Sequence, residues 1–434
     1  MSLRILQHES ANCRRFVTEL IARREASPVG VDRAVARILE QVRRDGDAAL
    51  VALTKRFDGV AIARERLRVS ADELAAAKSA LPPKERAALM VAARRIAAFH
   101  RRTLEKSFSY RDPLGLRLGQ IVRPLRRVGI YVPGGQASYP SSVLMNALPA
   151  RVAGVSEIVM VSPPNRAGDN VGVLAAAAIA GVSEVYRVGG AQAIAALAYG
   201  TRAIAAVDKI VGPGNAYVQA AKRMVYGVVD IDKMAGPSEV VVIADEKARP
   251  AWIAADLIAQ AEHGSGDEAA ILITPVPEVA EATAMALRRA LLDLPRAAEV
   301  RRVMARRGAA IVVENLEQAC ALANRIGPEH LELDLDEPHR WLSRIESAGA
   351  IFIGGQSPAP LGDYLAGPNH VLPTGGSARF ASPLGAYDFL KRTSIIEASA
   401  RGLAALGATT ARLARLEGFE GHARAVEVRL RPPL

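Results

Sequence analysis

The spacing of apolar residues divides the chain into a helical first quarter and a longer region in which strands and helices alternate. Between residues 28 and 107, apolar positions recur every three or four residues, which predicts amphipathic helices over 31–42 and 84–99. The turn signals Asp58-Gly59 and Pro82-Pro83 separate these segments. From about residue 128, short β-branched runs alternate with alanine-rich helical segments, as in the βαβ units of a parallel sheet.

The strand-like runs form two series. The first lies at 157–161, 185–188 and 209–211, and the second at 239–243, 270–274, 310–313, 330–333 and 350–353. The string Ala-Gly-Val-Ser-Glu occurs at 153–157 and again at 180–184, each time leading into a strand, which indicates two successive βα units. We therefore predict an α/β fold with two parallel sheets.

Two later segments have no strand pattern of this kind. The Gly/Pro-rich stretch 354–385 is too long for an ordinary loop, so we expect it to be functional. The helical tail from about 388 to 426 is too short to form a core of its own. We expect it to pack on a partner subunit.

Charge and composition narrow the classes of partner. A net charge of +11 is compatible with steering an anionic ligand, but the basic residues are scattered and aromatic residues make up only 4% of the chain. We expect a solvated basic surface and no nucleic-acid partner. No apolar run approaches the length of a membrane span, so we expect a cytoplasmic protein with no membrane partner. Cys13 and Cys320 have no metal-binding or redox spacing and read as structural thiols.

Three glycine-containing turns follow predicted strands, at 131–135, 188–192 and 211–215. Ligands of open parallel sheets bind beyond the carboxyl ends of the strands, and glycines at a helix N-terminus let the backbone approach a phosphate. None of the three turns is a GxGxxG fingerprint. Their spacing therefore leaves a dinucleotide site and ordinary turn glycines both open.

Polar residues in Gly/Pro-flanked contexts are candidates for a metal site. Gln260 and His263 are three residues apart at the end of a helical segment, so their side chains can share one face. Asp363 and His422 could complete a site of nitrogen and oxygen donors of the kind that zinc or manganese accepts. The alternative is that these histidines are hydrogen-bonded structural residues.

Glu329 and His330 place a carboxylate and an imidazole directly before a strand. Such a pair supplies a base that titrates near neutrality and a second carboxylate to activate water. Adjacent side chains of an extended segment point to opposite faces, so the two need not touch each other. A surface glutamate beside a core-capping histidine is the alternative.

Several strings, taken together and in this order, resemble the histidinol dehydrogenase family. They are YVPGG (131–135), VGGAQAIAALAYGT (188–201), DKIVGPGNAYV (208–218), AGPSEV (235–240), DLIAQAEHG (256–264), GPEHLEL (327–333), GDYLAGPNHVLPTGGSARF (362–380) and LEGFEGHA (416–423). Lys233, where an apolar residue is expected, and the stretch 264–268 depart from the family pattern, but neither position is a ligand.

The resemblance implies roles for particular residues. NAD would lie against Tyr131, Gln192 and Asn215. One Zn²⁺ per subunit would be held by Gln260, His263, Asp363 and His422. These four residues would also contact the substrate, together with Ser238, His330, His370 and Glu417. Glu329 and His330 would transfer protons.

It also implies an architecture and a homodimer. The family fold has two incomplete Rossmann-like domains, with extensions that embrace the partner subunit. The predicted division is an N-terminal extension over 1–27, a first Rossmann-like domain with the helical region over 28–128 and 238–380, a second, NAD-binding domain over 129–237, and a dimer arm over 381–434. The arm would carry Glu417 and His422 into the active site of the partner, so that the two subunits share their sites.

The activity implied is the four-electron, NAD-dependent oxidation of L-histidinol through L-histidinal to L-histidine, the last steps of histidine biosynthesis. A related zinc and NAD dehydrogenase acts on sulfopropanediol, but His370 and Glu417 suit a cationic amino and imidazole substrate better than a sulfonate. A zinc hydrolase is a rival from another class. The absence of an HExxH motif and the three glycine turns argue against it.

Overall fold

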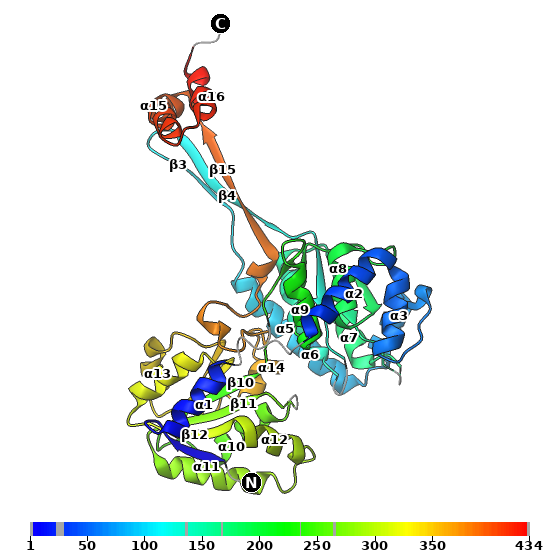
Figure 1. Ribbon diagram of the computed structural model, residues 1–434, viewed down its shortest axis with the longest axis vertical. Coiled ribbons are helices and arrows are strands. Elements are labelled where there is room, and N and C mark those ends of the chain that lie inside the picture. Colours follow the sequence, from blue (N-terminus) through cyan, green and yellow to red (C-terminus); the bar gives the residue numbers. More distant parts are fainter. Residues whose placement is uncertain are drawn as a thin grey trace.

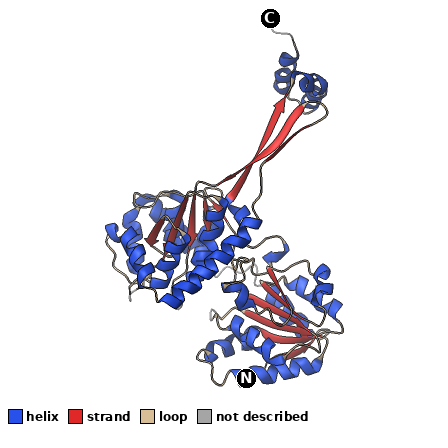
Figure 2. Ribbon diagram, turned by 180° about the vertical axis from the view of Figure 1, so that it is seen from behind, coloured by secondary structure: helices blue, strands red, loops and turns tan. Residues whose placement is uncertain are grey.

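The computed structural model describes residues 3–22, 30–134, 138–165, 168–234, 236–263 and 266–431. The chain forms two α/β domains, each with a central six-stranded sheet between layers of helices, and an arm that projects away from both (Figures 1 and 2). This agrees with the α/β class and the two parallel sheets predicted from the strand pattern. None of the described helices is both long and apolar enough to cross a membrane.

The domain that contains the predicted NAD-binding region, residues 129–237, is called the first domain from here on. Its sheet has the strand order β2-β7-β6-β5-β8-β9, in which only β2 runs antiparallel to its neighbour. Its strands are β2 (Arg68–Val69), β5 (Arg127–Tyr131), β6 (Glu157–Ser162), β7 (Glu184–Arg187), β8 (Lys209–Val211) and β9 (Asp230–Ile231). Its helices are α2 (Val31–Asp45), α3 (Asp47–Phe57), α4 (Ala71–Ala80), α5 (Pro83–Arg102), α6 (Pro140–Ala153), α7 (Val171–Ala180), α8 (Gly190–Tyr199) and α9 (Ala216–Val225).

Alternating residues of the strands feed two hydrophobic cores, one on each face of this sheet. In β6, Ile158 and Met160 pack with α4, α5, α6 and α7, whereas Val159 and Val161 pack with α2, α3, α8 and α9. Both faces are covered, so β6 is apolar and buried from Ile158 to Val161, as expected for a parallel sheet inside an α/β domain.

The second domain repeats this plan with the all-parallel order β1-β12-β11-β10-β13-β14. Its strands are β1 (Arg4–Gln7), β10 (Glu239–Ala244), β11 (Ala269–Thr274), β12 (Gly308–Val312), β13 (His330–Asp334) and β14 (Ala350–Ile353). Its helices are α1 (Ala11–Ala22), α10 (Pro250–Ala261), α11 (Pro277–Ala290), α12 (Ala297–Arg307), α13 (Leu316–Ile326) and α14 (Ala359–Tyr364). Helices α10, α11 and α12 cover one face, and α1 and α13 cover the other.

Within the two domains, two groupings differ from the predicted division, and the projecting arm differs as well, because it includes residues 108–124, which were expected in the domain over 28–128 and 238–380. Residues 31–102 were expected with 238–380, but their helices pack on the sheet of residues 127–231. Residues 1–27 were expected as an extension, but β1 is the edge strand of the second sheet, with Arg4 beside Ala309. In both cases the segment packs on strands that are distant in sequence, and helix periodicity does not report which sheet a helix covers.

The arm consists of a three-stranded antiparallel sheet and two helices at its far end. Its elements are β3 (Phe108–Arg111), β4 (Leu116–Pro124), β15 (Leu390–Ala398), α15 (Ala400–Leu416) and α16 (Glu420–Leu430). Strand β4 pairs with β15 along nine residue pairs, and α15 packs on α16 far from both domains (Figure 1). The hydrophobic core of the helix pair contains only Ala411, Ala414 and Ala423, while Leu416 is 83% exposed. The tail thus lacks a substantial core of its own, as its length predicts. It is not helical throughout as expected, because Leu390–Ala398 forms the strand β15, whose partner β4 is distant in sequence.

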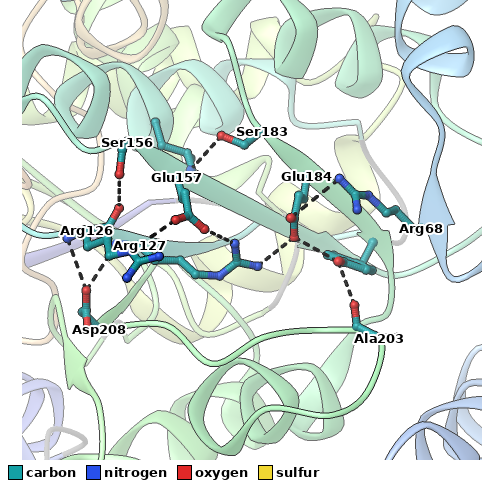
Figure 3. A network of polar contacts seen from close by, with 11 residues as sticks. Arg68, Arg126, Arg127, Ser156, Glu157, Ser183, Glu184, Ala203 and Asp208 are labelled. Atoms are coloured by element: carbon teal, nitrogen blue, oxygen red, sulfur yellow. Dashed lines mark hydrogen bonds and ion pairs between the residues drawn. The ribbon is translucent and has the colours of Figure 1, made fainter.

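Ion pairs close the amino ends of β5, β6 and β7 (Figure 3). The Arg127 guanidinium donates to Glu157 at 2.6 Å and to Glu184 at 2.7 Å, and the Tyr186 hydroxyl also donates to Glu184 at 2.9 Å. Arg127 is buried, so its charge depends on these two carboxylates. Ion pairs therefore occupy the amino edge of the first sheet, and its carboxyl edge remains available for a ligand.

Candidate functional site

A cavity of about 1040 Å³ opens at the carboxyl ends of β5, β6 and β7. Tyr131, Gln192 and Asn215, the three residues predicted to contact NAD, all line it. Strand β5 is the first strand of the parallel series, and successive strands are added on both of its sides. The cavity therefore lies at the switch point where doubly wound sheets bind nucleotides.

The three predicted residues present hydrogen-bonding groups to this cavity. The Tyr131 hydroxyl accepts a hydrogen bond from the Gly190 amide at 3.1 Å, and burial raises the pKa of Tyr131 to about 12, so its proton is retained for a ligand. Gln192 is 1% exposed, and within the described part of the chain its Nε2 has no hydrogen-bond partner. Asn215 caps α9 by accepting from two amides of the first turn at 3.1 Å.

A buried ion pair fixes the turn that leads to Asn215. Lys222 is fully buried, pairs with Asp232 and donates to the Gly212 carbonyl at 2.9 Å, while Asp232 accepts from the Gly212 amide at 2.9 Å. Gly212 has φ of +113°, and a Cβ atom there would lie 2.2 Å from the Tyr131 carbonyl oxygen. A side chain at this position would push the turn away from β5, so glycine is required.

The second group of candidate residues lies at the start of β13. Glu329 and His330 are buried, and His330 Nδ1 is 3.9 Å from Glu329 Oε2. The other ring nitrogen, Nε2, is 3.4 Å from Asp363 Oδ1 of α14. The Glu239 amide, at the start of the neighbouring strand β10, donates to Glu329 at 3.3 Å. One imidazole thus lies between two carboxylates.

The charges of this group are interdependent. Burial raises the pKa of Glu329 to about 7, against the lowering effects of His330 and of a hydrogen bond from Ser238. Burial alone would lower the pKa of His330, but the carboxylates of Glu329 and Asp363 raise it to about 9. The two carboxylates thus favour a proton on the imidazole, while burial disfavours charge on Glu329. A change in the charge around Asp363 would therefore change the protonation of His330, as a role in general acid–base chemistry requires.

The candidate metal ligands Gln260 and His263 lie at the end of α10, near Asp363. Gln260 is buried in the last turn, and within the described ranges its Nε2 has no hydrogen-bond partner. His263 follows the helix, and its charge interacts with that of Asp363. Zinc accepts nitrogen and oxygen ligands, which His263, Asp363 and Gln260 can supply. Gln260 would do so through its amide oxygen, which takes the place of Nε2 when the amide is flipped. Among the described residues, however, no group of three or more His, Cys, Asp or Glu side chains is placed to hold a metal ion.

His370 joins the two domains beside this group. Its Nδ1 is 2.9 Å from the Asp363 carbonyl oxygen, and its Nε2 is 3.4 Å from Ser142 Oγ of α6 in the first domain. A second cavity, of about 270 Å³, is lined by His330, Asp363 and His370. Three of the residues predicted to contact the substrate therefore face one hollow, next to the helix that follows Tyr131.

The remaining predicted residues, Glu417 and His422, lie on the arm. Glu417 ends α15, and His422 is in α16, where its ring stacks on Phe419 with centroids 5.0 Å apart. The arm projects away from both domains (Figures 1 and 2), so a single chain does not bring these two side chains to Gln260, His263 and Asp363.

The structure adds cavity residues that the sequence did not reveal. Arg37, Arg56 and Asp58 line the larger cavity from α2 and from the end of α3. In the sequence, Asp58 reads only as part of a turn, and the two arginines belong to the scattered basic residues to which no site was assigned. No local pattern distinguishes them, since they reach the cavity only through packing on a distant sheet.

Comparisons with known proteins agree on one family. The family model described as histidinol dehydrogenase matches residues 21–430. The chain is 52% identical to the histidinol dehydrogenase of Syntrophotalea carbinolica, with 99% of each chain covered, and 54% identical to that of Nitrosomonas europaea, with 92% of each covered. The crystal structure of histidinol dehydrogenase from Elizabethkingia anophelis superposes with a TM-score of 0.93 at 35% identity, covering 99% of this chain and 98% of that one.

Proposed function

The chain belongs to the histidinol dehydrogenase family of NAD-dependent oxidoreductases, and we propose that it oxidises L-histidinol through L-histidinal to L-histidine with two molecules of NAD and one zinc ion per subunit. The observation that carries this proposal is the position of the Glu329–His330 pair. Its imidazole is 3.4 Å from the candidate ligand Asp363, which also contacts His370 at the boundary with the NAD-binding domain.

Gln260, His263 and Asp363 would hold the zinc together with His422 of the partner subunit. Bound there, zinc would hold the substrate by its imidazole and amine and so orient the carbinol carbon. Asp363 is one of the two carboxylates that keep the proton on His330. Engaging Asp363 in a metal site would weaken that hold and return the imidazole toward its base form.

His330 then accepts the proton of the alcohol as a hydride passes to the dinucleotide beside Tyr131, Gln192 and Asn215. In the second half of the reaction, Glu329 accepts a proton from the water that adds to the aldehyde. As the water adds, His330 returns its proton to the carbonyl oxygen to give the hydrate, so that it is again a base when the hydrate is oxidised. Both groups are buried, so the aldehyde is shielded from bulk solvent between the two oxidations.

The choice of substrate rests on His370 and Glu417. A carboxylate beside an imidazole favours a cationic amino alcohol and disfavours a sulfonate. Ser238, which donates to Glu329, would contact the substrate from the start of β10. Because Glu417 and His422 lie at the tip of the arm, we propose that they reach the site of the second subunit in a homodimer.

Absorbance of NADH with each substrate tests the activity. We expect two NADH per L-histidinol, none per sulfopropanediol, and loss of activity when a chelator removes the metal. Turnover of sulfopropanediol alone would overturn the proposal. Release of free aldehyde in amounts equal to the first NADH would overturn the shielded two-step reaction.

A further inference from the structure

Helices α2 and α3 contribute three charged side chains to the larger cavity, and the proposed reaction gives them no role. Arg37, Arg56 and Asp58 all line it. Both arginines are exposed, and no carboxylate of the described residues forms an ion pair with either. Arg56 lies over the ring of Phe57 at 5.2 Å. The mouth of the cavity thus carries two positive charges that are free to attract an anion.

Asp58 is placed differently. It is the C-cap residue of α3, its amide donates to the Thr54 carbonyl at 2.9 Å, and its Oδ2 is buried with no hydrogen-bond partner in the described ranges. A helix C-terminus has a partial negative charge, which disfavours a further anion, and burial raises the pKa of Asp58 to about 6. A buried acceptor of this kind needs a donor, and none of the residues that the structure describes supplies one.

The fold indicates which part of a dinucleotide could supply that donor. In doubly wound domains an acidic residue binds the ribose of the adenosine half, usually at the end of the second parallel strand. The corresponding strand, β6, ends at Ser162 and continues with Pro163 and Pro164, so the usual acid is missing. Helix α3 packs on the short helix η2 (Arg64–Arg66), which leads into β2, the strand paired with β7, and Asp58 is therefore on the β7 side of the switch point, where the adenosine half would lie.

Only two carboxylates line the cavity within the described part of the chain, and one of them is occupied. Asp169 pairs with Arg187, which it contacts at 2.6 Å. Asp58 has no such cation. We propose that Asp58 accepts a hydrogen bond from the 2′-hydroxyl of the adenosine ribose and that it excludes a 2′-phosphate, while Arg37 and Arg56 attract the diphosphate. Asp58 thereby selects NAD over NADP, an inference that rests on the proposed NAD-dependent function.

The test compares nucleotide binding and kinetics in four variants. Asp58→Ala removes the acceptor and should weaken NAD binding by about tenfold, as expected for a lost hydrogen bond to a charged group. Asp58→Asn keeps an acceptor but removes the negative charge, so it should improve NADP binding relative to NAD by about tenfold or more. Arg37→Gln combined with Arg56→Gln should weaken both nucleotides to a similar extent. Asp72→Asn, on the exposed start of α4 and outside the cavity, is the matched control and should change neither.

Isothermal titration with NAD and with NADP, in the absence of substrate, measures binding, and steady-state kinetics with histidinol gives KM for each nucleotide. Thermal melting confirms that the variants are folded. If folded Asp58→Ala binds NAD as the unaltered protein does, or if Asp58→Asn leaves the NAD to NADP ratio unchanged, the role of Asp58 is refuted although the dehydrogenase function stands. If the unaltered protein binds neither nucleotide, the proposed function itself fails.

Discussion

The two parallel sheets have the same plan but carry their candidate functional residues at opposite edges. In the first sheet, Tyr131 ends β5, and the cavity lies beyond the carboxyl ends of the strands. In the second sheet, Glu329 and His330 lie at the start of β13, and Ser238 precedes β10, so the site is at the amino ends. Equal topology therefore does not imply an equal site.

The helix termini give a physical reason for this difference. The carboxyl edge of the first sheet presents the N-termini of α8 and α9, whose partial positive charge suits the phosphates of a dinucleotide. The amino edge of the second sheet presents the C-terminus of α10, next to Gln260 and His263. A partial negative charge there suits a metal cation or a protonated substrate. Each edge thus has the electrostatic sign that its proposed ligand needs.

The largest loss of activity should follow from changes at the amino edge of the second sheet, where His330 and Glu329 lie. His330→Asn should slow both oxidations by about 10²- to 10⁴-fold, because one imidazole serves both. Glu329→Gln should slow oxidation of histidinal by a similar factor and formation of the first NADH from histidinol far less. NADH formation is measured with each substrate separately, and Glu246→Gln, an exposed carboxylate of the same domain, is the control. Equal loss of both steps in Glu329→Gln would refute the division of roles.

Mixing two inactive variants tests whether a second chain completes the site at the amino edge of the second sheet. Inactive His330→Asn and inactive His422→Asn are mixed under conditions that exchange subunits. If the arm crosses, each heterodimer has one site with both defects and one with neither, so activity should rise to about half the unaltered value per heterodimer. If heterodimers form, as native mass spectrometry would show, and activity stays at the level of the parents, the shared site is excluded.

At the amino edge of the first sheet, the ion pairs of Arg127 should contribute to stability and not to catalysis. Arg127→Met leaves Glu157 and Glu184 without their shared cation and should lower the free energy of unfolding by about 2–4 kcal/mol. Arg126→Met is the matched control. Its guanidinium side chain is 84% exposed and pairs with Glu157 at 3.4 Å, so the loss should be below about 0.5 kcal/mol. Urea unfolding measures both, and similar losses would contradict the structural role of Arg127.

The smallest expected effect is a pH dependence of the first domain. His100 of α5 is 1% exposed, and burial lowers its pKa to about 4. In the unfolded chain its pKa is about 6.5, so protonation favours unfolding as the pH falls from 6.5 toward 4, by about 2 kcal/mol at pH 5. His100→Leu should remove this loss, and His339→Gln, at an exposed site, should not. The urea midpoints at pH 8 and pH 5 measure this loss of stability. An unchanged pH dependence in His100→Leu would show that His100 is not its source.

Local pattern was enough to predict most strands of the two parallel sheets and the family. The run at 239–243 corresponds to β10, which is apolar after Glu239 because it is buried on both faces, and the run at 330–333 corresponds to β13, whose Leu331 and Leu333 are buried. The motifs led to the histidinol dehydrogenase family, which the comparisons confirm. The roles of Gln260, His263, Asp363 and His422 stay predictions.

Long-range packing was not predictable in the same way. The amphipathic pattern of α2 shows that one face is buried, but it does not show that this face covers α8 and α9. For the same reason Asp58 could not be recognised as a cavity residue, since its placement depends on where α3 packs. The pairing of β1 with β12 joins four-residue and five-residue strands from distant parts of the chain, and neither carries a signal for the other.

The pairing of β4 with β15 has a consequence for the order of events during synthesis. All strands of both domain sheets have left the ribosome once Ile353 has emerged, but β15 begins only at Leu390. Until then, β4 has β3 on one side and an open edge on the other, and the helices α15 and α16 do not yet exist. A nascent chain can therefore complete both domain sheets while its arm is still absent. Any pairing of chains through the arm must wait until β15, α15 and α16 have been translated.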